Sequence, residues 1–190
     1  MGMKQTIEVL NQMVVDEIIA SYAIGGAIAA FRYIEPASTD DLDILVSFDA
    51  DAGLSGLVLL TPIISYLSKK GYTEFLREGL LIENWPVQFL PVATALDAEA
   101  LMGAATIEIE INPDEGSVPT RVLTAEHLMA TALNIGRPKD HIRLNQFIEA
   151  GVFNPSTLSS IIERHGLRAK WAGFCRRFGI DARLTLGRKA

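Results

Sequence analysis

The sequence has little of what marks several large protein classes. It contains a single cysteine, Cys175, in 190 residues, which excludes an intramolecular disulfide framework and a multi-cysteine metal site. Charged residues interrupt the opening segment, so no signal peptide is expected. The longest uncharged stretch, residues 52–68, falls short of the roughly 18 apolar residues that a membrane span requires. We therefore expect a cytoplasmic protein without a membrane partner.

Basic residues are scarce in the first part of the chain. Residues 1–115 carry 5 Lys and Arg against 18 Asp and Glu, whereas residues 116–190 carry 12 against 5. The composition as a whole, 49% apolar and 21% charged, is that of a globular protein. This asymmetry is compatible with two lobes of opposite charge. It also fits an enzyme that uses carboxylates for a metal and basic side chains for phosphates.

Hydrophobic periodicity predicts an α+β fold with two domains. In residues 1–115 we expect helices at 4–21, 27–33, within 54–70 and at Ala95–Met102, and strands at 22–24, 42–48, 73–77, 80–84, 87–91 and 106–111. Residues 112–119 contain two prolines and a glycine and are expected to form a linker. Residues 116–190 are expected to form a helical lobe, with helices near 124–134, 139–150, 156–165 and Arg168–Phe178.

Two short motifs contain the candidate binding residues. Gly25 and Gly26 end an apolar strand and lead into a helix, where backbone N–H groups can approach an anion closely. Asp41 and Asp43 lie at the start of the next strand, and their spacing places both carboxylates on one face. Adjacent carboxylates repel each other unless a cation lies between them, and Mg²⁺ binds one or two carboxylates together with substrate phosphates. The two motifs together indicate a phosphate site beside a metal site.

A resemblance to the nucleotidyltransferase superfamily, the polymerase-β-like fold, rests on the stretches YAIGGAIAAFRY and STDDLDILVSF. A later stretch, LTAEHLMATALNIGRPKDHIRLNQFIEAG, is similar to the helical segment of AbiEii-like and MenA-like nucleotidyltransferases, the toxins of type IV toxin–antitoxin pairs. The resemblance covers roughly residues 20–150. It implies a nucleotidyltransferase-like mixed sheet flanked by helices and followed by a C-terminal helical lobe.

The first motif pair acquires specific roles from this resemblance. Asp41 and Asp43 would be the catalytic carboxylates and would bind Mg²⁺ or Mn²⁺, while Gly25 and Gly26 would hold the triphosphate of an NTP. The reaction would be in-line attack of an RNA, protein or small-molecule acceptor on the α-phosphate, with loss of pyrophosphate. Such a reaction depends on positioning and on stabilisation of developing charge by the metal.

The resemblance implies further phosphate contacts and partners. Arg137 and Lys139, from the helical stretch, would reach phosphates of the nucleotide. Thr39 would orient the loop before Asp41 or a phosphate, although a hydroxyl at this position is also typical of a turn. RNA or a cognate antitoxin protein would be a partner if the chain is a type IV toxin.

The sequence departs from the superfamily at chemically important positions. Gln88, in the predicted strand at 87–91, stands where active members carry a third carboxylate, and a glutamine amide cannot take a proton at neutral pH. Glu83 is the nearest acid, but its odd offset places it on the opposite face unless Pro86 changes the register. Ala132 stands where the toxin-like motif carries a lysine.

Three hypotheses therefore stay open. The chain is a Mg²⁺-dependent nucleotidyltransferase, or it is a catalytically degenerate protein that binds a nucleotide, RNA or partner protein without turnover. The third and weaker hypothesis is a structural subunit with neither property. Gln88 and Ala132 favour the second hypothesis, and the paired motifs favour the first.

Overall fold

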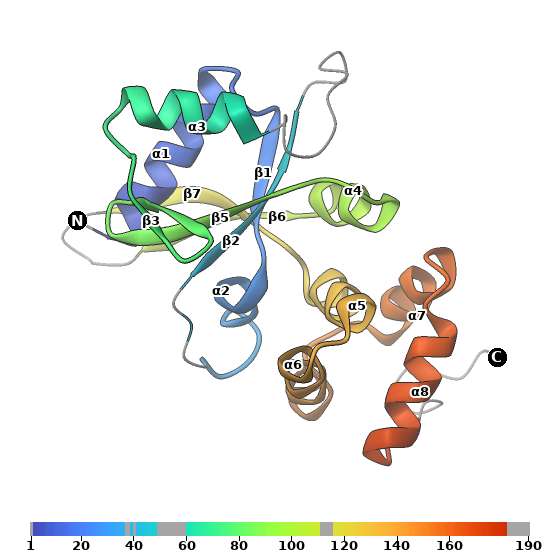
Figure 1. The fold of residues 1–190 in the computed structure, drawn as a ribbon. Coiled ribbons are helices and arrows are strands. Elements are labelled where there is room, and N and C mark those ends of the chain that lie inside the picture. Colours follow the sequence, from blue (N-terminus) through green and yellow to red (C-terminus); the bar gives the residue numbers. More distant parts are fainter. Residues whose placement is uncertain (1, 37–38, 40, 49–59, 111–115, 182–190) are drawn as a thin grey trace. The chain divides into compact units, whose positions relative to one another are not determined.

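The computed structural model describes residues 2–36, 39, 41–48, 60–110 and 116–181, which form two compact units. A sheet unit comprises Met1–Ala29 and Ala37–Leu123, and a helical unit comprises Ala30–Pro36 and Thr124–Ala190. The first unit contains both strands and helices and only helices follow it, so the predicted α+β class is confirmed (Figure 1).

A seven-stranded mixed sheet, in the order β3-β4-β5-β2-β1-β7-β6, forms the centre of the first unit. β2 pairs with β5 and β1 pairs with β7 in parallel, while the other neighbouring pairs are antiparallel. The strands are β1 (Ser21–Ile24), β2 (Leu42–Ser47), β3 (Phe75–Leu76), β4 (Gly79–Ile82), β5 (Trp85–Pro91), β6 (Ala105–Glu110) and β7 (Ser117–Val122). The glycine motif and the aspartate motif therefore belong to adjacent central strands.

Helices cover both faces of this sheet. Thr120 and Arg121 are consecutive in β7, so their side chains point to opposite faces. The Thr120 hydroxyl lies 3.0 Å from the hydroxyl of Tyr22, which donates to Asn11 of α1 (Met3–Val15). Arg121 instead donates to the carbonyl of Leu101 in α4 (Ala95–Met102), at 2.7 Å. α1 and α4 are therefore on opposite faces (Figure 1).

Two further helices belong to the connections between strands. α2 (Gly26–Ala30) is five residues long and follows β1 directly. α3 (Leu60–Lys69) buries Ile63 and Leu67, and Tyr66 on its surface donates to Asp16, the residue after α1, at 2.6 Å. Part of the helix expected within 54–70 lies outside the described residues. Within the residues that the structure describes, every helix is too short or too polar to span a bilayer.

Several predicted boundaries were wrong. α1 ends at Val15 instead of residue 21, and Glu17 just beyond it takes a left-handed φ of 56°. β7 begins inside the segment 112–119 that was expected to be a linker, and it pairs with β6 along its whole length. Val118 and Thr120 in β7 are buried while Pro119 between them is exposed, so the proline points away from the core. The sheet unit therefore extends to Leu123 and not only to residue 115.

The helical unit is built around α5. It contains α5 (Ala125–Ile135), α6 (Pro138–Ala150), α7 (Pro155–Arg164) and α8 (Arg168–Phe178), and α5 contacts each of the other three. Thr124 caps the start of α5 and Gly136 ends it in a left-handed conformation. Tyr33, from the separate segment Ala30–Pro36, packs against the buried Phe147 with ring centroids 6.0 Å apart.

We predict that Tyr22→Phe destabilises the protein by about 1–2 kcal/mol, because it leaves the buried Thr120 hydroxyl without this hydrogen-bond partner. Tyr66→Phe is the matched control, since the Tyr66 hydroxyl bonds Asp16 at an exposed position, and it should cost less than about 0.5 kcal/mol. Chemical denaturation followed by circular dichroism measures both. Equal costs for the two variants would contradict the assignment of Tyr22 to a buried network.

Candidate functional site

The glycine motif and the aspartate motif are in direct contact. Gly26 has a φ of +58°, and a Cβ built on it would lie 1.8 Å from Oδ2 of Asp43. Only glycine leaves room for this carboxylate, and only glycine takes this backbone conformation without strain. The Asp43 side chain therefore lies against the backbone at the junction of β1 and α2.

Gly25 has a different structural role from Gly26. Its N–H donates to the carbonyl oxygen of Asp43 at 2.8 Å, which continues the β1–β2 ladder to the end of β1. A Cβ at Gly25 would make only ordinary contacts, 3.5 Å from Leu123 Cδ1 and 3.8 Å from the Asp43 carbonyl oxygen. Gly25 is therefore linked to Asp43 by a backbone hydrogen bond, and this link does not require position 25 to lack a side chain.

The strand register places Gln88 beside Asp43. β2 and β5 are parallel, and Asp43 pairs with Gln88. Residues in register on neighbouring strands project from the same face, so Asp43 and Gln88 are side by side. The sequence resemblance put a third carboxylate at the position of Gln88, and that assignment stays a prediction.

Asp41 lies immediately before β2 and faces a cavity. The Thr39 hydroxyl donates to Asp41 Oδ1 at 2.9 Å, which holds the carboxylate in one orientation. Thr39, Asp41 and Gln88 all line this cavity, whose volume is about 660 Å³. The remaining lining comes from the β3–β4 turn and the start of β5: Leu76, Arg77, Glu78, Gly79, Asn84, Trp85 and Pro86.

Glu78, which the sequence analysis did not single out, supplies a further carboxylate to the cavity. Gln88 Nε2 donates to Glu78 Oε2 at 3.0 Å, so the amide in the third-carboxylate position holds the carboxylate of another residue. No motif marks Glu78. The available signal was the short hairpin around Gly79, but the expected strands at 80–84 and 87–91 left out Gly79 and Pro86, which belong to β4 and β5.

Glu83, the substitute considered from sequence, is engaged elsewhere. It lies in the turn between β4 and β5 with a φ of 50°, and its Oε1 accepts a hydrogen bond from the Tyr72 hydroxyl at 2.5 Å. Partial burial, together with this hydrogen bond, raises the pKa of Tyr72 to about 12. Glu83 is not among the residues that line the cavity.

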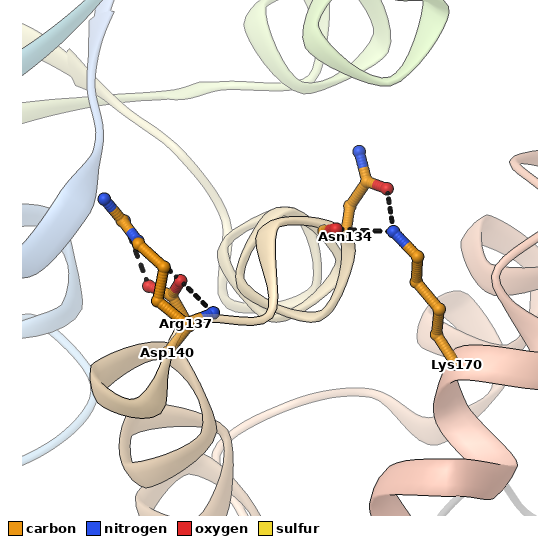
Figure 2. Close-up of polar contacts among 4 residues, drawn as sticks. All are labelled: Asn134, Arg137, Asp140 and Lys170. Atoms are coloured by element: carbon orange, nitrogen blue, oxygen red, sulfur yellow. Dashed lines mark hydrogen bonds and ion pairs between the residues drawn. The ribbon is translucent and has the colours of Figure 1, made fainter.

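Arg137 and Lys139 belong to the helical unit, at the start of α6. Arg137 donates to Asp140 through its backbone N–H at 3.0 Å, through Nε at 2.8 Å and through Nη2 at 3.1 Å (Figure 2). Asp140 is 1% exposed, so the guanidinium compensates a buried charge. Lys139 is exposed in the first turn of α6.

A second cation contacts the end of α5. Lys170 Nζ in α8 donates to the backbone carbonyl and the Oδ1 of Asn134, at 2.5 and 2.7 Å (Figure 2). A carbonyl in the last turn of a helix lacks an intrahelical partner, and a lysine there also interacts favourably with the helix dipole. This basic side chain thus has a structural role at the α5–α8 contact.

Two carboxylates at the start of β2, of which Asp41 lines the cavity, suit a hard cation. Asp41 and Asp43 offer only oxygen ligands, which Mg²⁺ and Mn²⁺ prefer. Among the residues that the structure describes, no group of three or more His, Cys, Asp and Glu is arranged to hold a metal. A Mg²⁺ ion held by Asp41 and Asp43 would take its other ligands from substrate phosphates and water.

Comparisons with known proteins find similar structures but no matching family. No protein-family model matches the chain, and no curated protein does. The solution structure of the antibiotic-resistance factor ANT(2'')-Ia shares 16% identity over 92% of this chain and 95% of that chain, with a TM-score of 0.47. The crystal structure of ANT(2'')-Ia in complex with adenylyl-2''-tobramycin gives 16% identity, coverages of 93% and 99%, and a TM-score of 0.42.

A third similar structure comes from a fungal protein. An antigenic nucleotidyltransferase-like protein from Paracoccidioides brasiliensis shares 13% identity, with 91% of each chain covered and a TM-score of 0.49. One of the three solved structures similar to this chain is thus described as nucleotidyltransferase-like.

We predict that Gly26→Ala is much more disruptive than Gly25→Ala. Alanine at 26 costs about 1–2 kcal/mol for its left-handed backbone and must also displace the Asp43 carboxylate. Alanine at 25 makes ordinary contacts and should cost under about 1 kcal/mol. Chemical denaturation of both variants measures the difference. Equal stabilities would show that the Asp43 carboxylate does not occupy the space beside Gly26.

We also predict that Asp140→Asn destabilises the helical unit by about 1.5–3 kcal/mol, because it removes the charge of a buried acceptor that receives three hydrogen bonds from Arg137. Glu149→Gln is the control, since Glu149 is an exposed acceptor of Asn145 on the same helix and should cost under about 0.5 kcal/mol. Thermal denaturation followed by circular dichroism at 222 nm reports the helical content. An Asp140→Asn variant as stable as the Glu149→Gln control would contradict this role.

Proposed function

We propose that this chain is a Mg²⁺-dependent nucleotidyltransferase that moves a nucleoside monophosphate from an NTP to a hydroxyl acceptor. The proposal rests on one observation above all, the contact between Gly26 and the Asp43 carboxylate. This contact brings a glycine turn and a carboxylate pair together in one site. Each of the two features is common alone. Asp41, one of the pair, also lines the cavity. The sequence resemblance to the nucleotidyltransferase superfamily supports the same function.

Each candidate site residue of the sheet unit has a specific role under this proposal. Asp41 and Asp43 hold the cation, and Thr39 keeps Asp41 oriented. Gly25 and Gly26 are assigned to the triphosphate by the sequence resemblance. Mg²⁺, when bound, supplies Lewis-acid stabilisation of the charge that develops on the phosphate oxygens. The acceptor oxygen bonds to the α-phosphorus, and pyrophosphate departs on the opposite side.

The sequence resemblance assigns two basic side chains of the helical unit to phosphates of the nucleotide. Lys139 is exposed and so is available as a phosphate ligand, as the sequence resemblance implies. Arg137 is assigned the same role, although its guanidinium also binds Asp140. The toxin-like branch of the superfamily, with RNA or a cognate antitoxin as partner, stays a prediction of the sequence resemblance.

Gln88 favours an alternative function, nucleotide binding without turnover. Its amide lies in register with Asp43, where a carboxylate would serve as a proton acceptor, and an amide cannot do so. A degenerate protein would bind Mg²⁺·NTP through Asp41 and Asp43 and release it unchanged. Gln88→Asp would then confer turnover that the natural chain lacks.

We predict that Asp41→Asn and Asp43→Asn each lower the rate of pyrophosphate release from Mg²⁺·NTP by at least about 10²-fold, because a bound metal contributes several kcal/mol to the transition state. Calorimetry with each of the four NTPs, with and without Mg²⁺, measures binding alongside the rate. Glu108→Gln is the control, because Glu108 is an exposed acid on β6 at the far edge of the sheet.

The outcomes separate the two functions. Mg²⁺-dependent binding and turnover, both lost in the aspartate variants and kept in the Glu108→Gln control, would support the transferase. Binding without turnover would support the alternative. No binding of any NTP would refute both functions and leave only the fold.

A further inference from the structure

The cavity and the glycine turn lie on opposite sides of β2. In the sheet order, β1 with Gly25 and Gly26 flanks β2 on one side, whereas β5, β4 and β3 follow on the other. The residues that line the cavity come from the β3–β5 side and from the segment just before β2. A triphosphate at the glycine turn would lie on the β1 side of β2 next to Asp43, with the cavity on the β5 side. In-line transfer requires the acceptor to approach from that far side.

The β3–β4 hairpin holds Glu78 at this cavity. A Cβ on Gly79 would lie 2.9 Å from the Pro86 carbonyl carbon and Cβ, so the backbone of β4 packs closely onto β5 at this point. The turn residue Arg77 takes a left-handed φ of 56°, which directs the chain from β3 back into β4. Glu78, between these two residues, is thereby brought to Gln88, whose Nε2 donates to Glu78 Oε2 at 3.0 Å.

We infer that the cavity is the acceptor site and that Glu78 is the proton acceptor for the attacking hydroxyl. The inference rests on the proposed nucleotidyl transfer. Gln88 of β5 stands where a carboxylate is missing, and Glu78 of the β3–β4 hairpin supplies one instead. Gln88 is a positioning residue that orients the Glu78 carboxylate. An amide suits this task, since its N–H donates to a carboxylate that remains able to take a proton.

The proposed step balances in atoms and charge. The acceptor oxygen forms a bond to the α-phosphorus, and the bond from that phosphorus to the oxygen bridging to the β-phosphate breaks. The electron pair of the broken bond leaves with pyrophosphate. The proton of the acceptor hydroxyl moves to the Glu78 carboxylate, which releases it to water after the product departs.

The cavity also limits the class of acceptor. Its volume of about 660 Å³ is in the range of sites for small organic molecules, and not of an extended macromolecular surface. Leu76 and Pro86 supply apolar lining, while Asn84, Glu78 and Gln88 supply polar groups for hydroxyls. A small molecule with several hydroxyl groups and an apolar face fits this combination.

The test uses glycerol as a small hydroxyl probe, and water as the background acceptor. Pyrophosphate release from Mg²⁺·NTP is measured for the wild type, Glu78→Ala and Glu78→Gln, and calorimetry measures Mg²⁺·NTP binding by the same proteins. We expect the Glu78 variants to lose at least about 10²-fold in rate, the lower range for general base catalysis, while their NTP affinity stays within about twofold. Added formate should restore part of the rate of Glu78→Ala but none of the rate of Glu78→Gln, whose amide fills the space.

Glu74→Gln is the matched control. Glu74 is an exposed glutamate just before β3 that does not line the cavity, so its substitution should leave rate and binding unchanged. A wild-type protein that turns over NTP, with Glu78 variants that retain the full rate, would overturn the role of Glu78 and leave the transferase function intact. A wild type that binds NTP without any turnover, or binds none, would overturn this inference together with the proposed transferase.

Discussion

The Asp43 carboxylate occupies the space that any side chain at position 26 would need. This single constraint connects β1, α2 and β2, because the glycine at the strand–helix junction is required by a residue on the next strand. The backbone bond from Gly25 to Asp43 fixes the same two strands in register. The register of β2 with β5 then determines that Gln88, and through it Glu78, lies beside the aspartates. The arrangement of the whole candidate site follows from the position of one carboxylate.

Much of the sheet unit was predictable because its signals are local. The apolar run after Asp41 predicted a buried strand, and β2 begins at the next residue. The helix Ala95–Met102 was predicted with the bounds it has, since Thr94 and Asp97 form a capping box that begins it. The roles of Asp41 and Asp43 were inferred from a resemblance, and the structure adds the contact with Gly26 that sequence spacing alone does not show.

What sequence reasoning missed depends on contacts between distant segments. β7 reads as a linker because Pro119 interrupts it, and its place in the sheet depends on pairing with β6 and β1. Glu78 carries no local signal, because its proximity to Gln88 is created by the packing of Gly79 on Pro86. The bond between Arg137 and the buried Asp140 gives a basic motif residue a structural role that a motif search does not reveal.

The segment Ala30–Pro36 belongs to the helical unit although more than eighty residues of the sheet unit separate it from the rest of that unit. Its Tyr33 ring packs on Phe147, so the helical core is closed by a piece of chain that precedes the aspartate motif. Residues 124–190 alone therefore do not contain the whole helical unit, and a fragment cut after residue 123 would leave Phe147 without its Tyr33 neighbour.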